Sequence, residues 1–188
     1  WRLFHEDVVT FDGEFYSVEG FRLEPSLGRP PRILAGGGGH DTDEGRRAYR
    51  SVKSRLDHAD GWIAAPGPIE DVAGDWASFA GYLESRGRDP SAVEKVALQY
   101  LHLVPGEDES AVAREQRNAY RGMVGPARSA EYAMENWLSG TVEAVRGTLA
   151  AYEREGFDEV ILYTVTPDPG SLERQLRRYR DLLCPGFG

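Results

Sequence analysis

The chain begins with two short runs of residues that favour β-strands, residues 8–11 and 14–18. Between them lies Asp12-Gly13, a pair typical of the two-residue type I′ turn that joins antiparallel strands. The pattern therefore predicts a β-hairpin with that turn. Proline and glycine mark residues 25–31 as a connecting segment. We assign residues 1–31 to a hairpin insertion and its connection.

From residue 32 onward, apolar runs alternate with segments in which apolar residues recur every three or four positions. The second spacing places apolar side chains on one face of a helix. The expected strands are residues 32–35, 60–64, 95–104 and 157–163, and the expected helices are residues 44–59, 68–87, 108–120, 141–156 and 172–183. Residues 122–132 predict either a loop or a short helix.

Four strands, each followed by a helix, predict an α/β fold with a parallel sheet and right-handed crossovers. We expect residues 32–188 to form these units as part of one domain, because no linker divides the chain. A complete (β/α)8 barrel has about 250 residues, whereas this chain has 188 and begins at Trp1 without an initiator methionine. The length therefore argues against a whole barrel and predicts a trimmed, processed or fragmentary chain.

The net charge and the length of the apolar runs exclude two classes of partner. With 22 basic and 31 acidic residues, the chain carries a formal charge of −9. That charge repels phosphate backbones, so we expect no nucleic-acid partner. The apolar run at residues 160–165 is far shorter than the roughly 20 residues of a membrane helix, so we expect no membrane partner. A single cysteine, Cys184, leaves no internal disulfide, which favours the cytoplasm.

Four consecutive glycines at residues 36–39 follow the first strand of the predicted sheet. Glycines at this position let the backbone turn sharply and point N–H groups at an anion such as a phosphate. The run lacks the Gly-Lys-Ser/Thr ending of a P-loop and the spacing of a G-x-G-x-x-G fingerprint, which disfavours those nucleotide sites. A flexible loop without a ligand fits the same residues.

Five short motifs then occur in a fixed order along nearly the whole chain: FDGEFY at 11–16, PPRILAGG at 30–37, ADGWI at 59–63, GTVE leading to LAAY at 140–152, and GFDEVIL at 156–162. In this order they resemble the C-terminal half of the bacterial luciferase-like flavin-dependent monooxygenases and of their deazaflavin (coenzyme F420)-dependent oxidoreductase relatives. The resemblance implies a TIM (β/α)8 barrel, of which this chain supplies strands five to eight, preceded by the hairpin.

The same resemblance implies a flavin-type cofactor, FMN or F420, across the C-terminal ends of the strands, together with a small organic substrate. The residues whose backbone would line the cofactor phosphate are Ala35, Gly36, Gly37, Gly38 and Gly39. Residues 40–44 resemble an insertion whose three acids are unfavourable beside a phosphate. The family residues that contact the flavin ring and the substrate come largely from strands one to four, so we assign no catalytic residue.

Several other polar residues favour a structural interpretation. Asp60 and Gly61 are typical of a tight strand entrance with Trp62 in the core, although a residue at the top of this strand would reach a flavin. His40 is interpreted as a solvated loop residue and His102, inside an apolar strand, as a barrel or interface residue with satisfied hydrogen bonds, with ligand contact as the alternative for each.

The remaining candidates point away from catalysis and metal binding. Residues 107–109 form an acidic run typical of a helix cap, Gly140-Thr141 is typical of a helix start, and Cys184 lacks a neighbouring histidine or basic group. The four histidines show no metal-binding spacing, so we expect no metal; they are His5, His40, His58 and His102.

Three functions remain open from the sequence. The first is an oxidoreductase or monooxygenase present as an N-terminally truncated half barrel, inactive alone and completed by its N-terminal half or a second subunit. The second is a non-catalytic flavin-binding or structural half barrel that pairs with another chain to cover its open sheet edges. The third is a phosphate-binding α/β domain unrelated to flavin.

Overall fold

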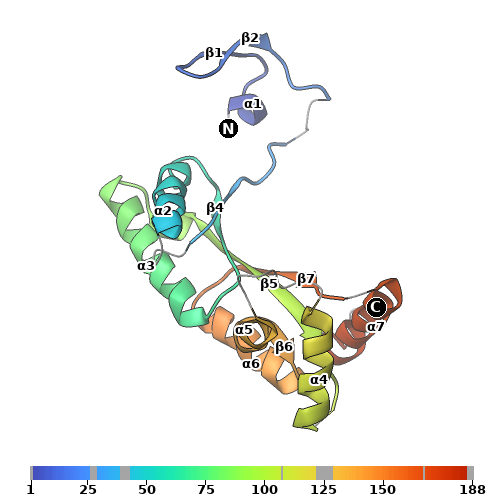
Figure 1. The fold of residues 1–188 in the computed structure, drawn as a ribbon. Helices are drawn as coiled ribbons and strands as arrows, with labels where there is room; N and C mark the ends of the chain where they lie inside the picture. Colours follow the sequence, from blue (N-terminus) through green and yellow to red (C-terminus); the bar gives the residue numbers. More distant parts are fainter. Residues whose placement is uncertain are drawn as a thin grey trace.

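The computed structural model describes residues 2–25, 29–38, 43–106, 108–121, 129–166 and 168–185. Its centre is a parallel sheet covered by helices, from which an N-terminal hairpin projects (Figure 1). The strands of the sheet are β3 (Leu34–Gly36), β4 (Gly61–Ala64), β5 (Glu94–Leu103), β6 (Leu138–Gly140) and β7 (Glu159–Thr164). The predicted α/β class with parallel strands is therefore confirmed.

Strand β5 organises the sheet because every other strand except β3 pairs with it. On one edge it pairs first with β4 and then, near its C-terminal end, with β6; β7 occupies the opposite edge from Val96 to Leu101. Strands β3 and β7 are the outer strands of the described residues. The sequence did not predict β6, which is only three residues long.

The helices follow the strands in the predicted alternation. They are α2 (Asp43–Leu56), α3 (Ile69–Ser85), α4 (Glu109–Tyr120), α5 (Ala130–Asn136), α6 (Val142–Arg154) and α7 (Pro169–Arg178), with a 3-10 turn at Pro90–Ala92 and a π-helical turn at Tyr179–Leu183. Helix α5 begins within residues 122–132, which were predicted to be either a loop or a short helix, while residues 122–128 lie outside the described residues. No described helix has the length and apolar character needed to cross a membrane.

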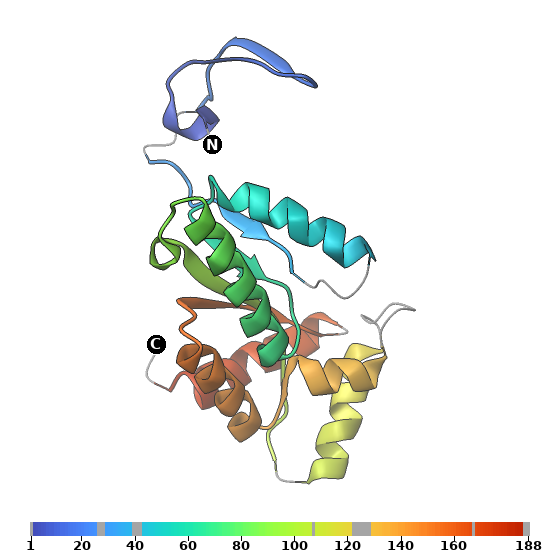
Figure 2. The same cartoon turned by 90° about the vertical axis from the view of Figure 1, so that its left-hand side faces the viewer.

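Helices α2, α3 and α6 cover one face of the sheet (Figures 1 and 2). The main core lies between them, and its large side chains are fully buried: Leu56 of α2, Trp62 of β4, Phe79 and Leu83 of α3, and Tyr152 of α6. Trp62 packs edge-on against Phe79, with ring centroids 5.3 Å apart. Alternating residues of β4 and β5 point into this layer, as expected for strands that are covered on one side by helices.

The N-terminal strands β1 (Val9–Asp12) and β2 (Ser17–Phe21) form the predicted antiparallel hairpin. The predicted two-residue turn is wrong: Asp12 pairs with Ser17, so residues 13–16 form a four-residue loop. The Ser17 hydroxyl donates to Asp12 Oδ1 at 2.5 Å, and Gly13 N–H donates to Tyr16 O at 3.0 Å. These two bonds close the longer loop without the left-handed backbone that a type I′ turn needs at both positions.

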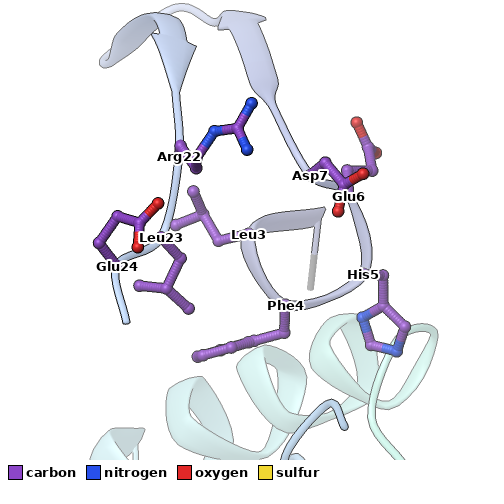
Figure 3. A pocket seen from close by; sticks show the side chains of 8 residues that line it. All are labelled: Leu3, Phe4, His5, Glu6, Asp7, Arg22, Leu23 and Glu24. Carbon is purple, nitrogen blue, oxygen red and sulfur yellow. The ribbon is translucent and has the colours of Figure 1, made fainter. Parts of the chain in front are cut away.

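A short helix, α1 (Arg2–His5), lies beside the hairpin, and a cavity of about 140 Å³ separates it from the segment after β2. Figure 3 shows Leu3 of α1 next to Leu23 of the segment after β2, while Glu6 and Asp7 lie away from that segment. Every described side chain of α1 is exposed. The hairpin arm therefore contributes little buried surface to the fold.

At the N-terminal ends of the strands, Arg32 joins two neighbours that are distant in sequence. Its guanidinium binds Glu94 at 2.9 Å and Glu159 at 2.6 Å, the first residues of β5 and β7. The Arg32 guanidinium donates a hydrogen bond to the carboxylate of Glu159. This bond raises the pKa of the guanidinium above its ordinary value. This pair of contacts aligns the starts of three strands.

Candidate functional site

The glycine loop leaves the C-terminal end of β3, the end of a parallel sheet where α/β proteins bind ligands. Gly37 has a φ of 126°, and its N–H donates to Ile63 O at 3.2 Å. The indole N–H of Trp62 donates to Gly37 O at 2.7 Å. A fully buried tryptophan of the neighbouring strand therefore fixes the path of the loop.

Side chains have little room along this loop. A Cβ on Gly37 would lie 2.9 Å from Val52 Cγ2, in a backbone conformation that only glycine adopts readily. A Cβ on Gly36 would lie 3.2 Å from Ile63 Cγ2, and one on Gly38 would meet the carboxylate of Asp75. The three glycines thus allow the backbone to approach its neighbours closely.

Beside the loop is a cavity of about 130 Å³ between the C-terminal ends of β3 and β4 and the start of α3. Pro68, the residue before α3, offers no side-chain hydrogen bond to the helix, so the first N–H groups of α3 have no side-chain cap. Such N–H groups and the helix dipole favour an anion. The described residues that line the cavity are Gly38, Ala64, Ala65, Pro66, Gly67, Pro68, Asp71, Val72, Asp75 and Tyr132.

The charged side chains around this cavity disfavour the anion that its main-chain N–H groups favour. Asp71 and Asp75 line it, and none of its described lining residues is a lysine, arginine or histidine. Asp75 is buried, with 7% of its surface exposed. The arrangement fits an oxyanion that is held by main-chain N–H groups, and the two carboxylates limit how much negative charge the site accepts.

The structure brings the predicted phosphate-loop residues together only in part. Gly38 lines the cavity, while Gly36 and Gly37 precede it along the same loop. Ala35 is buried in the core under the helices, so only its backbone remains for ligand contact. Gly39 and His40 lie outside the described residues. The assignment of these residues to a cofactor phosphate stays a prediction.

Asp60 and Trp62 have the structural roles that the sequence favoured. Asp60 Oδ2 accepts from Ile33 N–H at 2.8 Å and thereby joins the starts of β3 and β4. Trp62 is fully buried and also holds Gly37, which the sequence did not reveal. Asp75 was missed as well. The signal for it was its spacing, because an acid at this position continues the core-facing series of Val72 and Phe79 on α3.

The remaining candidates have local roles. Asp108 accepts from the N–H groups of Ser110 and Ala111 and caps α4, while Glu107 lies outside the described residues. Thr141 caps α6, and Cys184 is exposed. His102 is buried at the C-terminal end of β5. In the part of the chain that the structure describes, no three histidine, cysteine or acidic residues gather as a metal site would require.

A family model for luciferase-like monooxygenases matches residues 1–161. The chain belongs to the luciferase-like monooxygenase family. No curated protein sequence is similar enough to count as a relative. The family membership agrees with the resemblance of the five sequence motifs.

Solved structures of luciferase-like enzymes share the fold at low sequence identity. An F420-dependent secondary alcohol dehydrogenase in complex with an F420-acetone adduct has a TM-score of 0.69 at 13% identity, over 96% of this chain and 57% of that one. The coenzyme F420-dependent tetrahydromethanopterin reductase of Methanopyrus kandleri has a TM-score of 0.64 at 11% identity, over 97% and 59%.

An FMN-containing relative is similar to nearly the same extent. The oxygenating constituent of 3,6-diketocamphane monooxygenase from Pseudomonas putida, in complex with FMN, has a TM-score of 0.60 at 13% identity, over 98% of this chain and 60% of that one. The chain thus spans less than two thirds of the length of each of these structures.

Proposed function

We propose that this chain is the half of a flavin- or F420-dependent oxidoreductase or monooxygenase barrel that contributes the cofactor-phosphate loop. The observation that carries the proposal is the glycine loop itself, which stands at the C-terminal end of a parallel strand and is fixed by Trp62. Its neighbour is a helix start without a side-chain cap. Backbone N–H groups in this arrangement suit a phosphate, the group that FMN and F420 share.

The cofactor supplies the redox chemistry when it is bound, either activation of dioxygen or hydride transfer. In this proposal the N–H groups of Gly38 and of the first turn of α3 hold the phosphate end. Gly36 and Gly37 fix the path of the backbone, because Gly36 pairs with Ile63 and the main-chain groups of Gly37 bond to Ile63 and Trp62. Asp75 limits how deeply the phosphate enters the cavity beside the loop, because its carboxylate lies next to Gly38. The ring-binding and substrate-binding residues belong, in this proposal, to the other half of the barrel.

Titration of the chain with FMN and with F420, followed by the fluorescence of each cofactor, tests the proposal. We expect saturable binding of one of them that Gly37→Val weakens at least about tenfold, because the valine side chain displaces the loop from Val52. Gly81→Ala on α3 is the matched control, since a Cβ there meets nothing within 4 Å. Equal binding by both variants, or none by the unaltered chain, contradicts the proposal.

A second candidate function is a non-catalytic half barrel that is completed by another chain. The apolar side chains of β7 and α7 favour it, because Tyr163 and Leu176 are 57% and 53% exposed. Large exposed apolar surfaces of this kind mark contacts with other protein segments. Sedimentation distinguishes the two candidates: an associated chain without cofactor binding supports the second, and a stable monomer without cofactor contradicts it. The cytoplasm remains the proposed location.

A further inference from the structure

A second cavity lies at the C-terminal end of β5, between α4 and α7, and has a volume of about 260 Å³. It shares no lining residue with the cavity beside the glycine loop. Seven of its eight lining residues have polar or charged side chains; the eight are His102, Glu115, Asn118, Ala119, Ser171, Arg174, Gln175 and Arg178.

The charge of this lining differs from that of the whole chain. Two guanidinium groups, Arg174 and Arg178, face one carboxylate, Glu115, in a chain with a formal charge of −9. Burial disfavours the ionised form of Glu115, but the hydrogen bond and positive charge of Arg178 hold its pKa below the ordinary value. The carboxylate is therefore ionised at neutral pH. The lining itself carries two positive charges and one negative charge, and Asp168, which lies outside the lining, interacts electrostatically with Arg174.

Both arginines are held in place by other groups. Arg174 Nη2 donates to Ser171 Oγ at 2.7 Å, and Ser171 in turn donates to Asp168 Oδ2 at 2.6 Å. Arg178 Nη1 donates to Leu103 O at 2.8 Å and to Glu115 at 2.5 Å. A guanidinium with fixed orientation is well suited to bind carboxylate or phosphate oxygens, because little side-chain entropy is lost on binding.

His102 places a polar nitrogen at the cavity. The residue is 4% exposed, and its Nδ1 lies 2.8 Å from Val165 O. Because a carbonyl oxygen only accepts, Nδ1 carries a proton and the tautomer is fixed. The other ring nitrogen, Nε2, lies 3.4 Å from Glu115 Oε1 and 3.4 Å from Gln175 Nε2. It accepts from Gln175 when neutral and becomes a donor when protonated.

We propose that this cavity binds a small oxyanion, a carboxylate or a phosphate, between Arg174 and Arg178 with His102 beside it. The guanidinium of Arg174 lines the cavity in an orientation fixed by Ser171, and it supplies both the charge and the hydrogen bonds that the anion needs. The site stands at the C-terminal end of a different strand from the glycine loop, on the same end of the sheet. It is therefore placed to bind an acidic group of a substrate or effector, independently of any cofactor at the loop.

Titration of the chain with inorganic phosphate and with acetate tests this, at constant ionic strength and with chloride as the reference anion. Calorimetry gives the affinity, and the ring resonances of His102 report on the site. We expect one saturable site with a Kd on the order of 1 mM. Arg174→Gln should weaken it about tenfold, and Arg174→Lys less. Arg177→Gln is the matched control, because Arg177 pairs with Glu173 on the exposed face of α7.

The anion that saturates the site at the lower concentration identifies the ligand class. Equal binding by Arg174→Gln and Arg177→Gln overturns the inference, as does the lack of saturation by either anion. Phosphate binding that is lost in Gly37→Val but kept in Arg174→Gln also overturns it and assigns the phosphate to the glycine loop. Binding that is lost in Arg174→Gln alone supports the inference, whatever the outcome of the cofactor titration.

Discussion

Strands β4 and β7 lie on opposite sides of β5, and both contain apolar residues. Their side chains are buried to very different extents. On the β4 side, Trp62 and Phe79 are fully buried under α2 and α3. On the β7 side, Leu162 is 40% exposed and Tyr163 57%, although four of the six residues of the strand are apolar. The difference shows that an apolar pattern predicts which residues tend to be buried. It does not predict whether residues of the same chain bury them.

Helix α7 extends this contrast. Leu172 and Leu176 are one turn apart on the helix and are 39% and 53% exposed. Strand β7 pairs with β5 on one edge, and its other edge has no partner among the described residues. Exposed apolar side chains therefore occur both on β7 and on the helix that follows it, which agrees with the proposal that another half barrel packs there.

The largest expected effect is on the covered side. Trp62→Ala should lower the free energy of unfolding by about 3–5 kcal/mol, because it leaves a cavity in the core and removes the bond to Gly37. Trp62→Phe keeps most of the packing and loses the N–H donor. We expect it to cost clearly less in a urea titration while still weakening the cofactor loop. A Trp62→Phe variant as stable as the unaltered chain would contradict the role of the indole N–H, whereas an equal loss in both variants would contradict the contribution of packing.

The next largest effect is a difference between alanine substitutions at two glycines, Gly37 and Gly81. Gly37→Ala should destabilise the fold by about 1–3 kcal/mol, because its φ of 126° and the contact with Val52 disfavour any Cβ. Gly81→Ala on α3 should stabilise it by about 0.5–1 kcal/mol, because the helix has open space there. Thermal unfolding measures both. The same sign for both substitutions would refute the strain at Gly37.

A smaller effect concerns Tyr179, which packs near the less covered side. Burial raises the pKa of its hydroxyl to about 12, and the hydroxyl donates to Leu101 O at 3.1 Å. A raised pKa means that the folded state resists ionisation, so this contribution to stability is present below pH about 10 and is lost as the pH rises toward 12. Tyr179→Phe should cost about 1 kcal/mol at pH 7, and its stability should fall less steeply above pH 10 in denaturant titrations. Parallel pH curves for the two proteins would contradict this.

The smallest effect is expected at the exposed side itself. Leu162→Gln should lower the free energy of unfolding of the isolated chain by less than about 1 kcal/mol, since 40% of the residue is already exposed to water. Leu101→Gln, at a fully buried position of β5, is the contrast and should be strongly destabilising. If another segment covers β7, Leu162→Gln should also reduce association in sedimentation experiments. A large loss of stability without association would show that Leu162 is buried in the free chain.

The sequence predicted the parallel strands well because each carries a run of apolar residues next to a helix with regular spacing. It missed β6, since Leu138–Gly140 is defined only by pairing with Leu101–Leu103 of β5. It chose the wrong hairpin turn because Asp12-Gly13 favours a two-residue turn locally, whereas the bond between Ser17 and Asp12 stabilises a longer loop.

The candidate site was predictable only in its backbone. Consecutive glycines after a strand indicate the loop, but they do not reveal that Trp62 holds Gly37 from the neighbouring strand. Asp75 is 37 positions beyond Gly38 in number, and only the packing of α3 brings the two together. The second cavity combines residues of β5, α4 and α7, and no short motif in the sequence connects them.

Gln175 limits where a further strand can pair with β5. Its side-chain amide bonds both main-chain groups of Leu103, accepting from N–H and donating to C=O at 2.9 Å each, on the edge of β5 beyond the last residue of β7. An amide side chain imitates one residue of a neighbouring strand and has no chain to continue the ladder. This edge of β5 is therefore closed to a further strand beyond β7, and a strand added on this side has only the unpaired edge of the six-residue strand β7 to bond.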